Sequence, residues 1–287
     1  MPPALGMKTD IEGRAMKDFT NKIVYVVGGS SGIGLAAAEL FAAKGAHVCI
    51  FAQNEQRLRK AREAVSRRAA NKSQRFASFS VDVSDNGKVQ KIMGRAVKEF
   101  GAPDVLINAA GVVTPRVFAK VTYEQFDRTM RINVYGTRNT VAALLPHMKK
   151  RGGAIVNVSS IAGYVGVFGY TDYNASKFAV LGFTEALRSE LKPLGIEVFV
   201  LCPPDTDTPG LATENLTRPP ETQAIAANAK LMKPEAVAAA MIRGMEKGKF
   251  VILPGFDGKF TVLAQRLIPG VVRWVVDRAV RKVQKKR

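Results

Sequence analysis

Short runs of apolar residues alternate with longer amphipathic stretches along most of the chain. The amphipathic stretches repeat their apolar residues every three or four positions, which predicts helices, whereas the short apolar runs end at glycine, proline or polar residues, which predicts buried strands. Seven strands are expected, at residues 21–27, 47–54, 75–83, 103–111, 154–160, 196–203 and 249–255. This alternation predicts an α/β fold: a single doubly wound domain whose parallel sheet carries helices on both faces. Such domains bind ligands beyond the carboxyl ends of their strands.

The same pattern divides the chain into three parts. Residues 1–21 are polar and are expected to form a flexible arm, residues 22–256 form the domain, and residues 257–287 form an additional basic, amphipathic tail. Within the domain, one long helix is expected over residues 123–153, where two glycines end it, and a loop is expected at about residues 205–232.

A glycine-rich segment follows the first strand and opens the first helix. Glycines at such a turn let backbone amides and the helix N-terminus approach a pyrophosphate, so the segment predicts a dinucleotide site. A turn that merely requires glycine is the alternative, which the strand–loop–helix context disfavours. The expected cofactor contacts here are Gly28, Ser30, Ser31, Gly32, Ile33 and Gly34.

The end of the second strand bears on the choice between NAD and NADP. An acidic residue at this point would bind the ribose hydroxyls of NAD, but Ala52 occupies the position and no carboxylate repels a 2′-phosphate. Gln53 can donate a hydrogen bond, and Arg57 lies one helical turn further on. The sequence therefore favours NADP. The basic run at residues 57–75 is better explained as a solvated helix face than as a wider anion site.

Polar and small residues also follow the third and fourth strands. Asp82 and Val83 end the third strand, where a carboxylate and a backbone amide can meet an adenine edge. The fourth strand ends in small residues that let backbone pass close to a cofactor ribose: Asn108, Ala109, Ala110 and Gly111. Asn133 is a polar residue inside an otherwise amphipathic helix, a position that by itself indicates little.

Tyr173 and Lys177 are the candidate catalytic pair. They are four residues apart in a helical stretch, which places both side chains on one face. An ammonium beside a phenol favours the phenolate, so the pKa of Tyr173 is expected to fall toward neutrality. Ser160 ends the fifth strand upstream, and its hydroxyl can bind a substrate oxygen. A tyrosine and a lysine spaced so by chance are the alternative.

Composition narrows the class of protein. The formal net charge of +19 implies attraction to an anionic partner such as a phosphorylated cofactor, nucleic acid or an acidic membrane. No basic surface interleaved with aromatic residues is evident, so nucleic acid is not the expected partner. The two cysteines and two histidines form no metal-ligand cluster. Neither a signal peptide nor a transmembrane run is evident, so a cytoplasmic protein is expected.

The glycine loop, Asp82, Asn108–Gly111, Asn133, Ser160, Tyr173 and Lys177 together resemble the short-chain dehydrogenase/reductase family over roughly residues 21–255. The resemblance implies a Rossmann fold in which Tyr173 is the general acid and Lys177 lowers its pKa and binds the nicotinamide ribose. It implies that Ser160 holds the substrate carbonyl and that Asn133 anchors a water-linked proton relay. It also implies a homo-oligomer. Val27 and Ala109 depart from the family pattern, which has threonine and asparagine there.

The segment after the sixth strand supports a narrower resemblance. The expected cofactor contacts there are Pro203, Thr206 and Thr208. This segment and the loop that follows are similar to those of 3-ketodihydrosphingosine reductases, although Gln53 stands where arginine is usual. The resemblance implies reduction of a 3-keto long-chain base with NADPH. Alternatives are another hydrophobic ketone, such as a steroid or a 3-oxoacyl thioester, or a non-catalytic dinucleotide- or nucleic-acid-binding protein.

Two apolar features fit a lipid-like substrate. Tyr164, Val165, Val167 and Phe168 are candidate walls of an apolar slot. In the tail, valines alternate with basic residues around Trp274, which is typical of a helix lying on an anionic membrane. Residues 259–287 are therefore expected to bind membrane, and packing of the tail on its own domain or at a dimer interface is the alternative.

Overall fold

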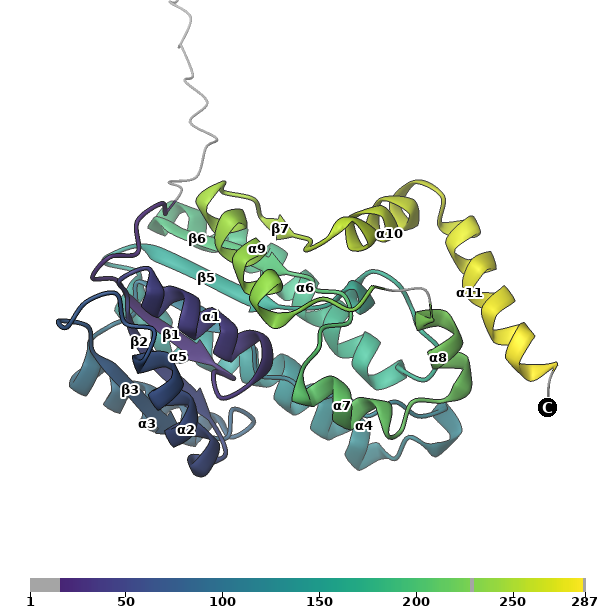
Figure 1. Ribbon diagram of the computed structural model, residues 1–287, viewed down its shortest axis with the longest axis horizontal. Coiled ribbons are helices and arrows are strands. Elements are labelled where there is room, and N and C mark those ends of the chain that lie inside the picture. Colours follow the sequence, from purple (N-terminus) through teal and green to yellow (C-terminus); the bar gives the residue numbers. More distant parts are fainter. Residues whose placement is uncertain (1–15, 228–229, 286–287) are drawn as a thin grey trace, which may run out of the picture.

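The computed structural model describes residues 16–227 and 230–285. Seven parallel strands form one sheet in the order β3-β2-β1-β4-β5-β6-β7 (Figure 1). The strands are β1 (Ile23–Val27), β2 (His47–Ala52), β3 (Phe76–Ser80), β4 (Val105–Asn108), β5 (Gly153–Val158), β6 (Ile196–Leu201) and β7 (Val251–Ile252). The predicted doubly wound fold is confirmed. The strand order reverses between β1 and β4, which opens a crevice at their carboxyl ends.

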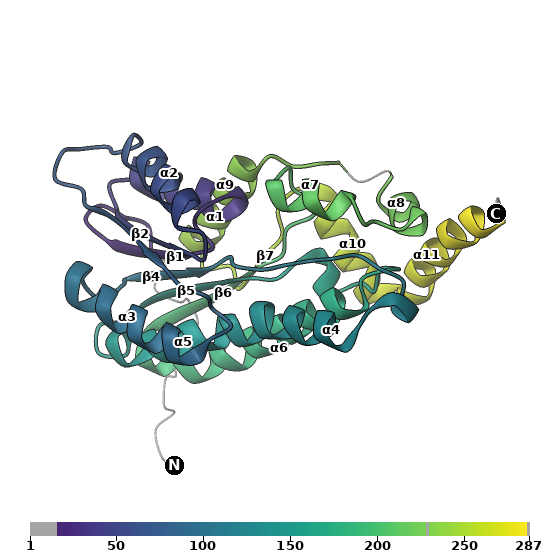
Figure 2. The ribbon, with the colours of Figure 1, turned by 90° about the horizontal axis from the view of Figure 1, so that it is seen from below.

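Helices cover both faces of the sheet, as Figure 2 shows. One layer consists of α1 (Gly32–Ala43), α2 (Glu55–Ser66) and α9 (Pro234–Glu246), and the other of α3 (Asn86–Phe100), α5 (Gly136–Met148) and α6 (Thr171–Leu191). Successive side chains of a strand point to opposite faces, so Val24 and Val26 pack toward the first layer and Tyr25 and Val27 toward the second. Two apolar cores result, one on each side.

The long helix predicted over residues 123–153 is present from residue 123 to residue 148, but it is not a uniform α-helix. It consists of α4 (Tyr123–Met130), a π-helical segment η2 (Arg131–Tyr135) and α5. Asn133 lies within the π segment, where its amide accepts from the Val112 amide at 2.8 Å and donates to the Val112 carbonyl at 3.0 Å. The wider turn places this side chain against the loop after β4. Bulges of this kind often occur at functional sites.

The segment predicted as a loop at about residues 205–232 contains two short helices, α7 (Pro209–Asn215) and α8 (Pro220–Ala226). Short 3₁₀ turns occur at η1 (Phe118–Lys120), η3 (Ile161–Gly163) and η4 (Lys192–Leu194). Of the predicted arm, residues 1–15 lie outside the described residues. Phe19 is buried and packs edge-on against Phe41, with ring centroids 4.9 Å apart. The packed part of the chain therefore begins before residue 22.

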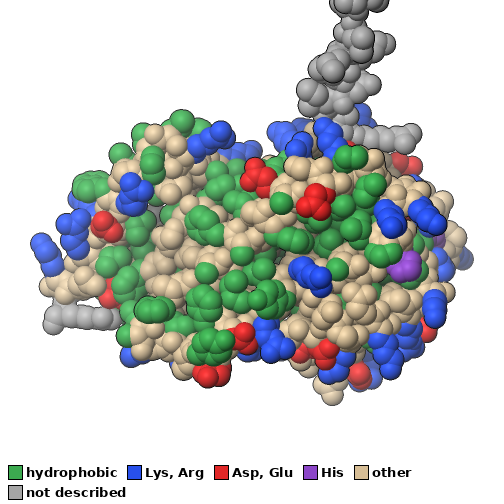
Figure 3. Space-filling view, turned by 180° about the vertical axis from the view of Figure 1, so that it is seen from behind, with side chains coloured by type: hydrophobic (Ala, Val, Ile, Leu, Met, Phe, Trp, Pro, Cys, Tyr) green, Lys and Arg blue, Asp and Glu red, His purple; other side chains and the backbone are tan. Residues whose placement is uncertain are grey.

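The predicted tail forms two helices, α10 (Phe256–Leu267) and α11 (Pro269–Gln284). α10 contacts η3, and α11 packs beside α8, so both helices fold back over the carboxyl end of the sheet (Figure 1). Figure 3 shows apolar and basic side chains gathered at the end of the molecule where α11 lies. Among the described residues, no helix is both long and apolar enough to span a membrane.

Candidate active site

A single cavity of about 780 Å³ extends from the glycine loop to the C-terminal helices. Its floor is formed by the carboxyl ends of the central strands, and its outer walls are formed by α7, α8, α10 and α11. Most of the residues predicted from the sequence line it: Gly28, Ser30, Ser31, Gly32, Ile33, Gly34, Gln53, Asp82, Val83, Ala109, Ala110, Gly111, Ser160, Tyr173, Lys177, Pro203, Thr206 and Thr208. Residues far apart in the chain thus share one site.

The glycine loop is shaped as a cradle for a phosphate group. Gly28 has a φ of +80°, and a Cβ there would lie 2.5 Å from the Ala110 amide nitrogen, so only glycine fits. The N-cap of α1, Ser31, makes no side-chain capping hydrogen bond, and the first turn of α1 carries no acidic residue. The helix N-terminus therefore keeps free amide donors and a positive dipole end facing the cavity, which fits a pyrophosphate.

The end of β2 is consistent with a cofactor that carries a 2′-phosphate. Gln53 donates to the Asp82 carboxylate at 3.2 Å, and Asp82 also accepts from the Ser84 hydroxyl at 2.7 Å. These contacts hold Asp82 on the β3 side of the cavity. Arg57 lies in the first turn of α2, is exposed, and is not among the residues that line the cavity.

Asn108 also lies outside the cavity lining, in contrast to the small residues that follow it. Its side chain is buried, donates to the side-chain Oδ1 of Asn157 at 2.9 Å and accepts from the Thr140 hydroxyl at 2.7 Å. Asn157 in turn donates to Thr184 at 3.0 Å. This buried chain of hydrogen bonds ties β4 to β5, α5 and α6, so the side chain of Asn108 supports the site from behind.

Asn133 and Lys177 meet behind Gly111. A Cβ on Gly111 would lie 3.3 Å from Asn133 Oδ1 and 3.5 Å from Lys177 Nζ, so both side chains border this glycine. Asn133 also donates to the Ser176 hydroxyl at 2.9 Å. The π segment therefore brings Asn133 next to the lysine, as a relay between the two would need, although Asn133 does not itself line the cavity.

Lys177 is almost fully buried, with 5% of its surface exposed, and its ammonium donates to the Val158 carbonyl at 3.0 Å. Desolvation lowers the pKa of Lys177 from its ordinary 10.5 to about 8. Its Nζ lies 5.5 Å from the centroid of the Tyr173 ring. The helical spacing thus produces the expected pair.

The predicted direction of the Tyr173 shift is wrong. Burial raises the pKa of Tyr173 above its ordinary value, because a phenolate would be poorly solvated there, and a hydrogen bond with the Ser160 side chain only partly opposes this effect. The Ser160 hydroxyl also accepts from the Ala162 amide at 3.1 Å, as the N-cap of η3. Tyr173 therefore holds its proton at neutral pH beside a fixed serine hydroxyl.

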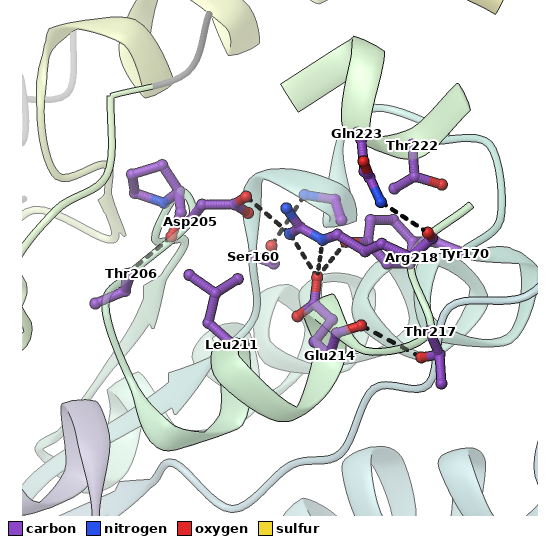
Figure 4. Close-up of polar contacts among 12 residues, drawn as sticks. Ser160, Tyr170, Asp205, Thr206, Leu211, Glu214, Thr217, Arg218, Thr222 and Gln223 are labelled. Carbon is purple, nitrogen blue, oxygen red and sulfur yellow. Dashed lines mark hydrogen bonds and ion pairs between the residues drawn. The ribbon is translucent and has the colours of Figure 1, made fainter. Parts of the chain in front are cut away.

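A charged cluster beside these residues was not predicted from the sequence. Arg218 donates to Glu214 and to Asp205, the latter at 2.8 Å, and the Tyr170 hydroxyl donates to Glu214 (Figure 4). The spacing of Glu214 and Arg218, four residues apart, was the available signal. Their meeting with Asp205 depends on how α7 folds over the cavity, which no local pattern gives.

The apolar wall differs from the one expected. Val165 and Val167 line the cavity, but Tyr164 and Phe168 do not. The wall is completed by α10 and α11 through Phe260, Ala264, Ile268, Val271, Val272, Val275 and Val276. Part of the valine-rich face of the tail therefore faces the cavity. This arrangement agrees with the alternative in which the tail packs on its own domain.

Comparisons with known proteins agree with this architecture. A family model described as short chain dehydrogenase matches residues 22–219. A 3-ketodihydrosphingosine reductase of Bos taurus is 40% identical over 237 residues, which cover 82% of this chain and 71% of the relative. A 3-ketodihydrosphingosine reductase of Dictyostelium discoideum is 37% identical over 264 residues, covering 86% of this chain and 79% of the relative.

A solved structure shows the same fold with a cofactor. L-sorbose reductase of Gluconobacter frateurii, complexed with NADPH and L-sorbose, superposes with a TM-score of 0.73 at 25% identity and covers 82% of this chain and 95% of its own. The matched family model covers β1 to β6, the glycine loop and the Ser160–Tyr173–Lys177 set. This chain belongs to the short-chain dehydrogenase family.

Proposed function

We propose that this protein reduces the 3-keto group of a long-chain base, converting 3-ketodihydrosphingosine to dihydrosphingosine with NADPH. One observation carries the proposal: a single cavity joins a phosphate cradle, the Ser160–Tyr173–Lys177 set and a long apolar wall. A substrate with a reactive keto group and a long alkyl chain needs these last two features side by side. The relatives named as 3-ketodihydrosphingosine reductases support the choice of substrate.

The cofactor would be held by the glycine loop, the amides at the N-terminus of α1, Asp82 and Lys177. A cofactor with a 2′-phosphate is favoured because Gln53 can donate a hydrogen bond to it and because Ala52 stands where an acidic residue would repel it. Thr206 and Thr208 line the same cavity and are proposed to bind its carboxamide or pyrophosphate. When bound, the nicotinamide supplies a hydride to the carbonyl carbon.

The residues around the carbonyl provide the proton and hold the oxygen. The Ser160 and Tyr173 hydroxyls hydrogen-bond the carbonyl oxygen and polarise it. As negative charge develops on this oxygen, Tyr173 donates its proton to it, which completes the alcohol. The raised pKa of Tyr173 keeps the proton in place until that charge develops, and the Lys177 ammonium stabilises the phenolate that remains. Asn133 positions the path by which Lys177 returns a proton to Tyr173.

A competition assay tests the choice of ketone. Purified protein with NADPH is offered 3-ketodihydrosphingosine, a steroid ketone and a 3-oxoacyl thioester, and consumption of each is followed by mass spectrometry. The long-chain base is expected to have the highest kcat/KM. A higher kcat/KM for either other ketone would reject this substrate while keeping the family.

We further propose that residues 259–287 bind an anionic membrane surface peripherally. Trp274 remains 53% exposed beside basic residues, and the exposed Phe256 and Leu267 of α10 lie near it in the chain. Trp274 is the only tryptophan, so its fluorescence reports on the tail alone. A blue shift with anionic vesicles, absent with zwitterionic ones, is expected, and equal spectra would reject membrane binding.

Homo-oligomerisation through the α4 and α6 surface is also proposed. Tyr123 is 80% exposed on α4 and Phe178 is 46% exposed on α6, so both aromatic side chains are accessible to a second copy of the chain. Sedimentation analysis of the wild type and a Phe178→Asp variant tests this, and a monomeric wild type would reject it.

A further inference from the structure

Three charged side chains from separate segments meet at the cavity (Figure 4). Asp205 follows β6, Glu214 lies in α7, and Arg218 follows α7. The Arg218 guanidinium donates to Glu214 Oε1 through Nε at 2.8 Å, and its Nη2 donates to both Glu214 and Asp205. One guanidinium is therefore shared by two carboxylates, which leaves one negative charge in excess.

This excess charge lies next to the position of the reacting carbonyl. The Ser160 hydroxyl donates to the Pro203 carbonyl at 3.5 Å, which ties it to the backbone two residues before Asp205. Tyr170 donates to Glu214 and has its ring 5.6 Å from the Tyr173 ring. Asp205 and Glu214 are thus linked to the Ser160–Tyr173 pair through the Pro203 backbone and the Tyr170 ring.

Asp205 is the member of the cluster that can accept another donor. The three hydrogen bonds that Arg218 and Tyr170 donate to Glu214 all end on its Oε1, and with only 11% of its side chain exposed Glu214 is much less accessible to a ligand than Asp205. The Asp205 side chain is 35% exposed, and within the described part of the chain its Oδ1 accepts no hydrogen bond. Asp205 is also one of the residues that line the cavity.

The chemistry of the cluster fits a cation bonded close to the keto group. Two carboxylates around one guanidinium give the cluster a local net negative charge, which favours a cationic ligand over a neutral one. A 3-keto long-chain base carries an amino group on the carbon next to the carbonyl, and this amine is protonated at neutral pH. With the carbonyl at Ser160 and Tyr173, the ammonium comes beside Asp205.

We propose that the Asp205 carboxylate binds the substrate ammonium, with Arg218 and Glu214 holding Asp205 in place, so that this cluster selects amino ketones over neutral ketones. The inference rests on the proposed function and adds the group that recognises the head of the substrate. It also explains how a cavity with a largely apolar wall distinguishes a long-chain base from other hydrophobic ketones.

The test uses two long-chain 3-ketones that differ only at carbon 2, where one carries the amine and the other carries hydrogen. The wild type is expected to prefer the amino ketone in kcat/KM by at least about tenfold, the effect of one charge-assisted hydrogen bond. In Asp205→Asn this preference is expected to fall to near unity. Asp207→Asn is the control, because Asp207 is exposed in the same segment and does not line the cavity, and it should keep the wild-type preference.

The outcomes separate the inference from the proposed function. Reduction of neither ketone by the wild type would overturn the proposed function and this inference with it. Equal reduction of both would overturn the inference alone, and this comparison does not depend on the folding of any variant. An Asp205→Asn enzyme that is folded by circular dichroism and keeps the wild-type preference would overturn the assignment of Asp205.

Discussion

Lys177 allows a prediction in which stability and function oppose each other. Its side chain is 5% exposed, and desolvation lowers its pKa from 10.5 to about 8. At neutral pH the lysine is still charged in the folded protein, so folding must bury a charge. Lys177→Met keeps a side chain of similar length and removes the charge. We expect this variant to be inactive but more stable than the wild type without cofactor.

The magnitude follows from the pKa shift. A fall from 10.5 to about 8 corresponds to a cost of about 3 kcal/mol while the lysine is charged in both states. The variant also loses the hydrogen bond from Nζ to the Val158 carbonyl, which costs about 1 kcal/mol. The free energy of unfolding of Lys177→Met at pH 7 should therefore exceed that of the wild type by about 2 kcal/mol.

The sign of the pH dependence follows from proton binding. Between pH 8 and 10.5 the unfolded lysine binds more protons than the folded one, so the stability of the wild type gains from rising pH in this window. The free-energy cost of burying the Lys177 charge is fully present below pH 8, where the folded lysine is charged. This cost should fall by about 2 kcal/mol between pH 7 and 9.5. The advantage of Lys177→Met should then nearly vanish at pH 9.5.

Urea unfolding of both proteins without cofactor, at several pH values, measures these differences. Lys98→Met is the control, because Lys98 is exposed in α3 and its replacement should change stability by less than about 0.5 kcal/mol at any pH. A Lys177→Met variant that is less stable than the wild type at pH 7, or whose advantage does not change with pH, would refute the reasoning.

Three further predictions concern the site. The kcat/KM of reduction should fall as pH rises through about 8, because Lys177 then loses its proton. A kcat/KM that does not change between pH 7 and 9 would contradict the role of Lys177. Gly34→Ala should weaken NADPH binding at least about tenfold in fluorescence titration, because a Cβ there would lie 2.3 Å from a backbone oxygen of the glycine loop. Gly94→Ala, where a Cβ meets nothing within 4 Å, is its control and should bind normally. Val276→Lys should raise KM for a long-chain ketone more than for a short one, because the new charge would border the apolar wall. If the two KM values rose equally, α11 would not bind the chain.

Those parts of the site that depend on local patterns could be predicted from the sequence. The glycine loop directly follows a strand, and Tyr173 and Lys177 share a helix face because they are four residues apart. The π segment could not be predicted in this way, because the partner that holds Asn133 is Val112, twenty-one residues away in the chain. The spacing pattern therefore predicts the long helix but not the π segment within it.

Burial explains the other differences between expectation and structure. Desolvation in the folded protein raises the pKa of Tyr173 and outweighs the hydrogen bond with Ser160, and this effect cannot be seen in a spacing pattern. The valine repeat of the tail correctly indicated an apolar helix face. Periodicity cannot tell whether such a face meets lipid or protein, and Val272 and Val276 in fact line the cavity.

The central claim is that Tyr173 gives a proton to the keto oxygen of a long-chain base at this cavity. It is tested most directly by measuring dihydrosphingosine formed from 3-ketodihydrosphingosine and NADPH by purified wild type and Tyr173→Phe. NADPH binding is measured in parallel. The wild type should form the product, and the variant should bind NADPH normally but turn over at least about 100-fold more slowly, the contribution of a positioned general acid. Turnover by Tyr173→Phe near the wild-type rate would contradict the account.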